Sequence, residues 1–209
     1  MLKKFLNHEK GITGLETAII LIAFVVVAAV FAYTALSAGL FSTQKSQEAV
    51  YSGLKEAQST LELRGGVIAV ADSTGADGEI AMIKFVVANV LGGEHIDFTP
   101  PDDADHDGIS DNGSENVVVI NYQDKQQTVD NIFWTSDKLG NADDDDLLEN
   151  EERFEITLGD ASGNLTDALS GYPLSVKTTF NIEILTPGGA TLNIERTTPA
   201  WIDDIINLR

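Results

Sequence analysis

Residues 17–44 read TAIILIAFVVVAAVFAYTALSAGLFSTQ and contain no charged side chain. The stretch is longer than the roughly 20 apolar residues that a helix needs to cross a bilayer. Its apolar side chains fall on every face of a helix, which excludes the half-buried helix of a soluble domain. The sequence therefore predicts a helix whose surroundings are lipid or other apolar helices.

The predicted helix continues beyond this stretch in both directions. Val50 and Leu54 recur at helical spacing between charged residues. No proline occurs before Pro100, and the glycine pair at 65–66 supplies a stop signal. We therefore expect one continuous helix over residues 12–63, with a length of about 75 Å at 1.5 Å per residue.

The remaining residues, 64–209, consist of short runs rich in Val, Ile, Thr and Phe. The runs are VIAVAD (67–72), EIAMIKFVVANVL (79–91), ENVVVINYQ (115–123), ERFEITLGD (152–160), LSVKTTFNIEILT (174–186) and ATLNIERTT (190–198). Polar turns that contain glycine separate them, and no helical pattern lies between them. The chain is thus predicted to be α+β, with a long N-terminal hydrophobic α-helix followed by an antiparallel immunoglobulin-like β-sandwich head domain.

Composition excludes several classes of protein. The 209 residues include 33 acidic and 13 basic side chains, so the net charge is −20. Nucleic acid is excluded as a partner, because phosphate contacts need a basic surface. The absence of cysteine excludes a disulfide scaffold, a zinc–thiolate site and a thiol nucleophile. Three histidines and no recognisable hydroxyl–histidine–carboxylate set argue against an enzyme.

Residues 1–11, MLKKFLNHEKG, form a short basic leader. An ordinary secretory signal has its cleavage site after the apolar core, whereas Lys10-Gly11 lies before it. A simple membrane anchor with cytoplasmic lysines is the alternative. Glu16 favours cleavage between Gly11 and Ile12, which makes this glutamate the fifth residue of the mature chain. A carboxylate at the edge of an apolar helix is costly in lipid and normally has a partner.

The string EKGITGLETAIILIAFVVVAAVFAYTALSAGLFSTQKSQE at 9–48 resembles the N-terminus of archaellins, the archaeal flagellins. That family resembles type IV pilins in having a class III leader, which is cut after a glycine just before the apolar helix. Residues 140–143, 147–156 and 189–199 are similar to archaellin head-domain patterns. The resemblance implies three parts: a leader peptide (1–11), a hydrophobic assembly helix (12–63) and a head domain (64–209).

The resemblance also implies a function and partners. The chain would be a structural subunit of the archaellum, polymerising through its helix with itself and with related archaellin subunits into an extracellular motility filament. A prepilin or preflagellin peptidase would cut the membrane-inserted precursor between Gly11 and Ile12, and the archaellum motor and membrane platform would be further partners. By analogy with pilins, Glu16 of a neighbouring subunit would neutralise the freed α-amino group of Ile12.

Two other functions remain open on the residues alone. The first is an adhesive type IV-like archaeal pilin, and the second is a monomeric membrane-anchored calcium-binding surface protein. The tail segment IERTTPAWIDDII at 194–206 favours an archaellin over a pilin. The junction Lys10-Gly11 disfavours the monomeric anchor, which would need no cut before its apolar helix.

The sharpest chemical motif is an acidic loop with alternating carboxylates around Gly108. Such a loop directs several hard oxygens to one point, which suits Ca²⁺ with its 6–8 oxygen ligands. The predicted ligands are the carboxylates of Asp103, Asp105, Asp107 and Asp111 and the carbonyl of Ile109. Ser114 replaces the glutamate that ends an EF-hand loop, so we expect a free-standing calcium loop; the alternative is a solvated acidic turn. We expect His106 and the second acidic run, Asp143 to Asp146, to be solvated.

Two sequons begin at Asn112 and Asn164 and predict N-glycosylation if the head lies outside the cytoplasm. Asn164 lies in a polar turn and is the better candidate, because Asn112 is crowded by the predicted metal loop. Trp134 and Trp201 lie in or beside strand patterns, and we expect both to belong to the core.

Overall fold

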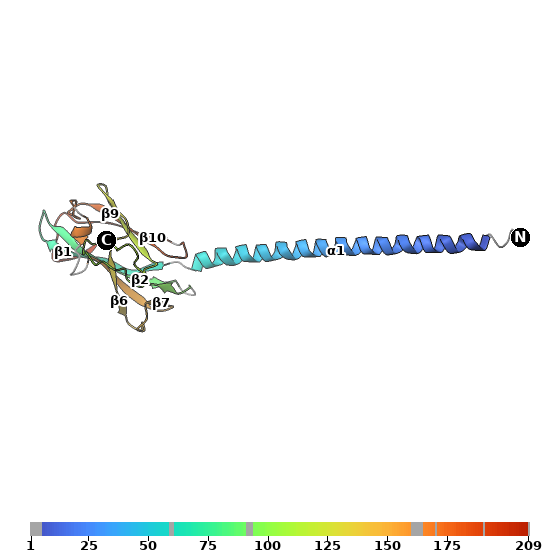
Figure 1. The fold of residues 1–209 in the computed structure, drawn as a ribbon. Helices are drawn as coiled ribbons and strands as arrows, with labels where there is room; N and C mark the ends of the chain where they lie inside the picture. The colour runs from blue at the N-terminus through green and yellow to red at the C-terminus, as the bar shows by residue number, and fades with distance from the viewer. Residues whose placement is uncertain are drawn as a thin grey trace. The chain divides into compact units, whose positions relative to one another are not determined.

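The computed structural model describes residues 6–58, 61–90, 94–159, 165–169, 171–189 and 191–208. The chain divides into two compact units, Met1–Ser52 and Gly53–Arg209, and the second unit contains the β-rich head (Figure 1). The elements are α1 (Leu6–Gln58), β1 (Leu61–Ser73), β2 (Glu79–Asn89), β3 (Ile96–Asp97), β4 (Val119–Gln123), β5 (Thr128–Val129), β6 (Trp134–Leu139), β7 (Leu147–Leu148), β8 (Arg153–Leu158), α2 (Leu165–Ala168), β9 (Thr179–Leu185), β10 (Thr191–Thr197) and β11 (Ile205–Leu208).

Helix α1 is continuous over 53 residues, as the uninterrupted apolar stretch predicted. It ends at Gln58, whereas the sequence predicted a helix to residue 63. Leu61 and Leu63 belong instead to β1, where they pair with Asn89 and Val87 of β2. The physical reason is that Leu61 is buried in the strand, and a free helix would leave it in water.

The head is built from two antiparallel sheets, which confirms the predicted sandwich architecture. One sheet has the order β11-β1-β2-β8-β6 and the other has the order β10-β9-β4-β5, and β3 and β7 form a separate small pair. Every strand pair within them is antiparallel. The six predicted strand runs correspond to β1, β2, β4, β8, β9 and β10, whereas none of the six covers the edge strands β6 and β11.

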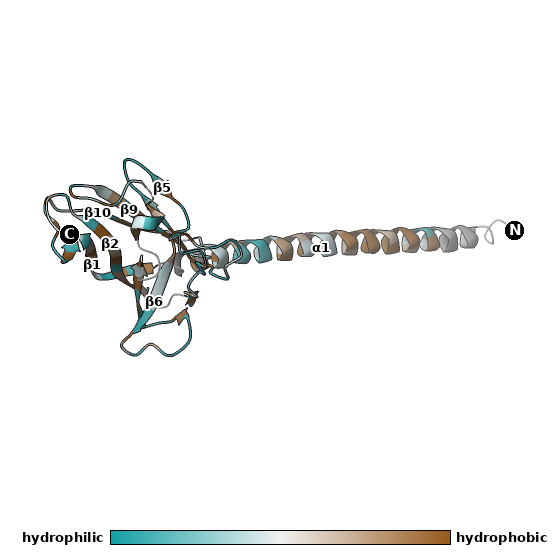
Figure 2. Cartoon of the chain, turned by 60° about the vertical axis from the view of Figure 1, so that its left-hand side comes forward, coloured by the Kyte–Doolittle hydropathy of each residue, from teal (hydrophilic) through white to brown (hydrophobic). Residues whose placement is uncertain are grey.

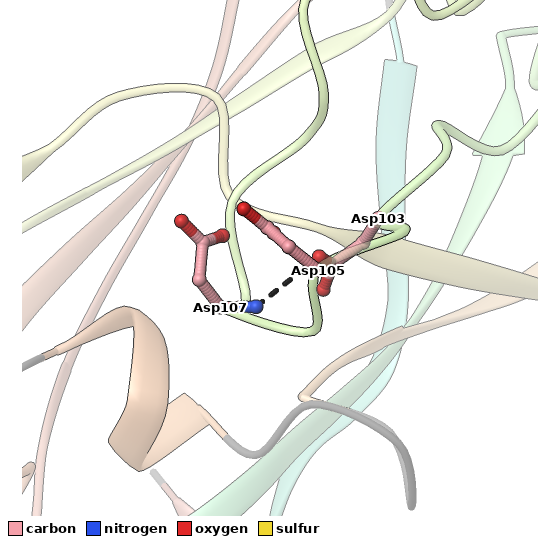
Figure 3. Close-up of side chains that lie close together, drawn as sticks. All are labelled: Asp103, Asp105 and Asp107. Carbon is pink, nitrogen blue, oxygen red and sulfur yellow. Dashed lines mark hydrogen bonds between the residues drawn. The ribbon is translucent and has the colours of Figure 1, made fainter.

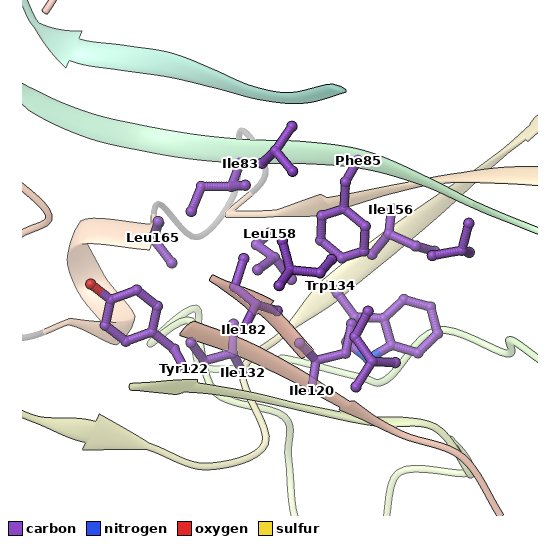
Figure 4. Packing of buried hydrophobic residues seen from close by; sticks show 14 of the residues in the cluster. Ile83, Phe85, Ile120, Tyr122, Ile132, Trp134, Ile156, Leu158, Leu165 and Ile182 are labelled. Carbon is purple, nitrogen blue, oxygen red and sulfur yellow. The ribbon is translucent and has the colours of Figure 1, made fainter. Parts of the chain in front are cut away.

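The core lies between the two sheets, with apolar side chains entering from both (Figure 4). Phe85 of β2 and Ile156 of β8 come from one sheet, and Ile120 of β4 and Ile182 of β9 come from the other. Each large apolar side chain removed from water stabilises the fold by about 1.5–3 kcal/mol. The alternation of buried and half-buried residues in β9 is the period-2 pattern of a strand with one covered face.

The two tryptophans differ in their surroundings. Trp134 of β6 is fully buried and packs edge-to-face on Phe98, with ring centroids 5.8 Å apart, so the core expectation is confirmed. Trp201 is 60% exposed, and the same expectation is wrong for it. Its neighbour Ile202 is fully buried instead. Trp201 lies in a bend just before Ile202, whose β-bridge with Gly75 holds it in place, and only Ile202 of the two enters the core.

Candidate functional site

The surface of α1 is the largest apolar feature that the structure describes. Every residue from 14 to 54 is exposed, including Ile20 at 68% and Phe31 at 70%. The segment Gly14–Leu54 is long and apolar enough to span a membrane, and apolar residues dominate the middle of the helix in Figure 2. An apolar helix surface that is exposed over this whole length needs a cover, which lipid or other apolar helices can supply.

Glu16 lies near the start of this apolar surface. Its side chain is exposed and makes no hydrogen bond or ion pair within the residues that the structure describes. Gly11 and Ile12, the predicted cleavage junction, lie within α1, but their side chains are outside the described set. The cleavage site and the role of Glu16 therefore stay predictions.

The acidic loop brings three carboxylates together. The ligand oxygens of Asp103, Asp105 and Asp107 all lie within 4.8 Å of one another (Figure 3). The side chain of Asp103 accepts hydrogen bonds from the backbone N–H groups of Asp107, at 3.2 Å, and Gly108, at 3.1 Å. These bonds turn the chain sharply, so the alternating carboxylates converge on one side of the loop.

The other two predicted ligands have a different role in the loop. The carboxylate of Asp111 lies outside the group of three and accepts the backbone N–H of Ala104 at 2.8 Å. Ile109 donates its backbone N–H to Asp107 at 2.8 Å and forms a β-bridge with Ile132. Both residues brace the loop against itself and against the strands.

Gly108 holds the loop in place. It adopts a φ of +80°, where side chains with a Cβ are strained. A Cβ at this position would lie 2.8 Å from the Cβ of Ala168 in α2. The glycine is therefore required for two reasons. The first is the turn, which the sequence predicted, and the second is a close packing contact, which the sequence did not predict. His106, which is exposed, takes no part in that contact, and its expected solvation is confirmed.

A second carboxylate cluster was not expected from the sequence. Ligand oxygens of Asp143, Glu149 and Glu152 lie within 4.8 Å of one another. Glu152 is only 8% exposed and accepts the backbone N–H groups of Asp143, at 3.2 Å, and Glu149, at 3.0 Å. The second acidic run was predicted to be solvated from Asp143 to Asp146. Asp143 to Asp145 are exposed, whereas Asp146 is half-buried and pairs with Lys138 at 3.1 Å. No sequence pattern marked Glu152 as a member of a cluster, because its partners lie three and nine positions away in an irregular loop.

Of the two glycosylation sequons, only the first is described. Asn112 is exposed in the turn that follows the acidic loop. Asn164 lies outside the described residues, so its accessibility stays a prediction.

The chain combines an exposed apolar helix with an acidic antiparallel sandwich. Known proteins with similar sequences and structures identify the family that has this architecture. The sequence model of the archaeal-type flagellin family matches residues 11–196. Probable flagellin 1 of Archaeoglobus fulgidus is 35% identical over 218 residues, which cover 98% of each chain. The chain belongs to the archaeal-type flagellin family.

Other relatives agree with this assignment. Probable flagellin 2 of Archaeoglobus fulgidus is 36% identical and covers 94% of this chain and 93% of that protein. The structure of the archaeal flagellum of Methanospirillum hungatei strain JF1 is similar, with a TM-score of 0.62 and 30% identity over 93% of this chain and 98% of that one. Archaeal flagellin FlaB1 of Methanocaldococcus jannaschii shares the fold, with a TM-score of 0.53 at 12% identity over 71% of this chain and 96% of that one.

Membership of this family decides between the functions that the residues left open. This flagellin is a structural subunit of the archaeal flagellar filament and not an enzyme. Its place is the extracellular filament, and α1 suits the membrane insertion of the precursor. The pilin and the monomeric calcium-binding anchor are set aside, because family membership extends through the head as well as the helix.

Proposed function

We propose that this flagellin polymerises through α1, which passes from lipid into a bundle of identical or related helices. The observation that carries the proposal is the complete exposure of an apolar surface from Gly14 to Leu54. Lipid and a helix bundle are the two environments that cover such a surface on all sides. Small residues in the apolar part, such as Ala28, Ala29 and Gly39, allow neighbouring helices to approach closely.

Processing would commit the subunit to assembly. A prepilin-type peptidase cuts between Gly11 and Ile12 and frees the α-amino group of Ile12. Glu16 of an adjacent subunit then neutralises this charge, since an isolated carboxylate in an apolar bundle is costly. The archaellum motor and its membrane platform are the partners that this filament needs for motility.

The acidic loop is proposed to hold a structural Ca²⁺ ion. Its support is the convergence of the Asp103, Asp105 and Asp107 carboxylates within 4.8 Å, which is the hard-oxygen donor set that calcium prefers. Asp111 and the carbonyl of Ile109 complete the proposed site, with Asp111 acting directly or through water. In a chain of net charge −20, a dication at this loop would offset local repulsion.

Glycan is proposed at Asn164 and Asn112. The support is the sequon at each position together with the extracellular location of the filament. Asn112 is the site whose exposure the structure describes.

A charge in the middle of α1 tests assembly through the helix. Val26→Asp places a carboxylate on a surface that is covered by lipid or by other helices, at a cost of about 2.5–3.5 kcal/mol per subunit. We expect no filaments by electron microscopy, while Val26→Leu, the matched apolar control, assembles normally. Normal filaments from Val26→Asp would show that α1 does not form the filament core.

A further inference from the structure

The turn at Asn112 and Gly113 carries the only asparagine–glycine pair in the sequence. Both residues are exposed. Asparagine is one of the residue types that heat degrades, because the backbone nitrogen of the next residue can attack its side-chain amide. Whether this attack occurs depends on the residue that follows and on the contacts that hold the two groups, and the structure describes both.

Little holds the two reacting groups apart. Within the part of the chain that the structure describes, no hydrogen bond involves the side chain of Asn112 or the N–H of Gly113. A Cβ built on Gly113, whose φ is +99°, would meet no atom within 4 Å, and glycine has no side chain of its own to shield its nitrogen. One backbone hydrogen bond crosses the pair, from the N–H of Ser114 to the carbonyl of Asp111 at 3.3 Å. Rotation about the bond between Cα and the carbonyl carbon of Asn112, which brings the nitrogen to the side chain, therefore breaks at most one long hydrogen bond.

The pair Asp107-Gly108 in the same loop is held differently. The N–H of Gly108 donates to the carboxylate of Asp103 at 3.1 Å, and Gly108 is buried against Ala168. Its nitrogen is therefore occupied, and the carboxylate of Asp107 resists attack because it is negatively charged. Of the two pairs, the one at Asn112 is the reactive one.

Water has access to the turn. A hollow of about 380 Å³ opens beside it, and Asp102, Asp111, Asn112 and Gly113 are among the residues that line it. Exposed loop tips with small and polar residues are the parts of a protein where the backbone is most open to chemical attack. The hollow therefore supplies the water that the reaction consumes.

We infer that Asn112 is a deamidation site, at which the backbone nitrogen of Gly113 displaces the side-chain amide. The nitrogen of Gly113 loses its proton and bonds to Cγ of Asn112, while the bond from Cγ to Nδ2 breaks and Nδ2 leaves as ammonia. The product is a cyclic succinimide. Water then adds at either carbonyl of the ring and opens it to aspartate or to isoaspartate. The reaction consumes a water molecule, releases ammonia and needs no oxidant or reductant.

Isoaspartate changes the path of the main chain at this turn. The chain then runs through the former side chain, which adds a methylene group between Asp111 and Ser114. Both residues are tied to Asp102, because Asp111 donates its N–H to the carbonyl of Asp102 at 2.8 Å and the hydroxyl of Ser114 accepts the N–H of Asp102 at 3.0 Å. A longer path between two points tied to the same residue disturbs both ties, so the isoaspartate form loosens this end of the acidic loop.

The glycan proposed at Asn112 uses the same nitrogen. A glycan on Nδ2 replaces one of its hydrogens, so ammonia can no longer leave, and deamidation in turn removes the sequon. The two modifications therefore exclude each other at this residue. This exclusion rests on the proposed glycosylation, whereas the deamidation of an unmodified Asn112 does not.

Peptide mapping by mass spectrometry tests the reaction. The full chain is made in a host without N-glycosylation, solubilised in detergent and incubated for days in isotope-labelled water. We expect the peptide that contains Asn112 to gain the mass of an NH₂-to-OH exchange with labelled oxygen, and to separate into an aspartate and an isoaspartate form. Asn150 is the internal control, because it is exposed in a turn but precedes Glu151, and its conversion should be several-fold slower. Conversion of Asn112 no faster than that of Asn150, or the absence of isoaspartate at residue 112, would overturn the inference.

Two variants separate the parts of the inference. Asn112→Gln should stop the reaction, since attack on the longer side chain would have to close a larger ring, and continued conversion of this variant would contradict the cyclic route. Asn112→Asp carries the added charge without the added methylene. Hydrogen exchange at the N–H groups of Asp102 and Asp111 should be several-fold faster in the deamidated parent chain than in fresh Asn112→Asp. Equal exchange in the two would overturn the loosening of the acidic loop.

Discussion

The hydroxyl of Tyr122 lies among the core residues of the head and donates a hydrogen bond to the Asp124 carboxylate at 3.0 Å. Burial raises the pKa of Tyr122 well above its ordinary value, and the negative charge and hydrogen bond of Asp124 raise it further. Each of these effects disfavours the phenolate. The folded head therefore keeps this proton at a pH where the unfolded chain loses it.

This difference predicts a pH dependence of stability. An unfolded tyrosine loses its proton near pH 10, so the stabilising contribution of Tyr122 is complete below pH 10 and is lost as the pH rises above it. We expect the free energy of unfolding to fall with a steepness of up to about 1.4 kcal/mol per pH unit in this range. Tyr122→Phe should remove that slope in denaturant titrations between pH 9 and 11.

The matched control is Tyr172→Phe, because the side chain of Tyr172 is exposed. This variant should keep the slope of the parent protein. If Tyr122→Phe retained the full slope as well, another group would be responsible for the alkaline loss of stability.

At the scale of an element, the acidic loop is a short irregular segment that hydrogen bonds and one glycine hold in shape. A bound Ca²⁺ at a hundredfold excess over its dissociation constant would stabilise the folded head by about 2.7 kcal/mol. For a domain of this size, that free energy corresponds to a change in melting temperature of roughly 5–10 °C. Calorimetry in calcium and in chelator should show this difference for the parent protein.

Asp105→Ala combined with Asp107→Ala should lower the melting temperature in calcium by a similar amount and abolish the effect of chelator. Asp72→Ala combined with Asp77→Ala makes the same change of charge at two exposed positions near the β1–β2 turn and should leave the calcium response intact. An identical transition for the parent in calcium and in chelator would reduce the loop to a solvated acidic turn.

At the scale of the whole molecule, the proposed processing would convert a membrane-inserted precursor into a filament subunit. Cleavage after Gly11 would leave residues 12–209 and remove three lysines and one glutamate. Mass spectrometry of filaments should find Ile12 as the first residue, with additional glycan mass on the peptides that contain Asn164 or Asn112.

Gly11→Val should block the cut and leave the chain in the membrane fraction, because the proposed cut follows this small residue. Gly14→Val is the matched control, since a Cβ at Gly14 meets no atom within 4 Å and the junction is unchanged. A mature chain that starts at Met1 would contradict the leader assignment, whatever the state of the filament.

The acidic motif shows how far a site could be predicted from spacing. The alternating spacing around Gly108 predicted that Asp103, Asp105 and Asp107 lie close together, and in the structure they do. Neighbouring residues of a tight turn converge for local reasons, so spacing is enough to predict it. Asp111 shares this spacing, but its carboxylate lies outside the group of three and accepts the N–H of Ala104, so its part in the proposed site stays a prediction. Which of two nearby groups a carboxylate binds depends on backbone geometry that spacing does not specify.

The sequence alone determined the apolar helix and most of the strands, because hydrophobic periodicity is a local property of the chain. The family resemblance also came from the sequence alone. The tertiary structure decided where α1 gives way to β1, since the burial of Leu61 depends on the sheet in which β1 pairs with β2. It likewise decided that Ile202 enters the core while Trp201 faces outward, next to the turn at Gly75. In each case the partner is distant in the sequence, and the free energy of burial exists only after the sheet has formed.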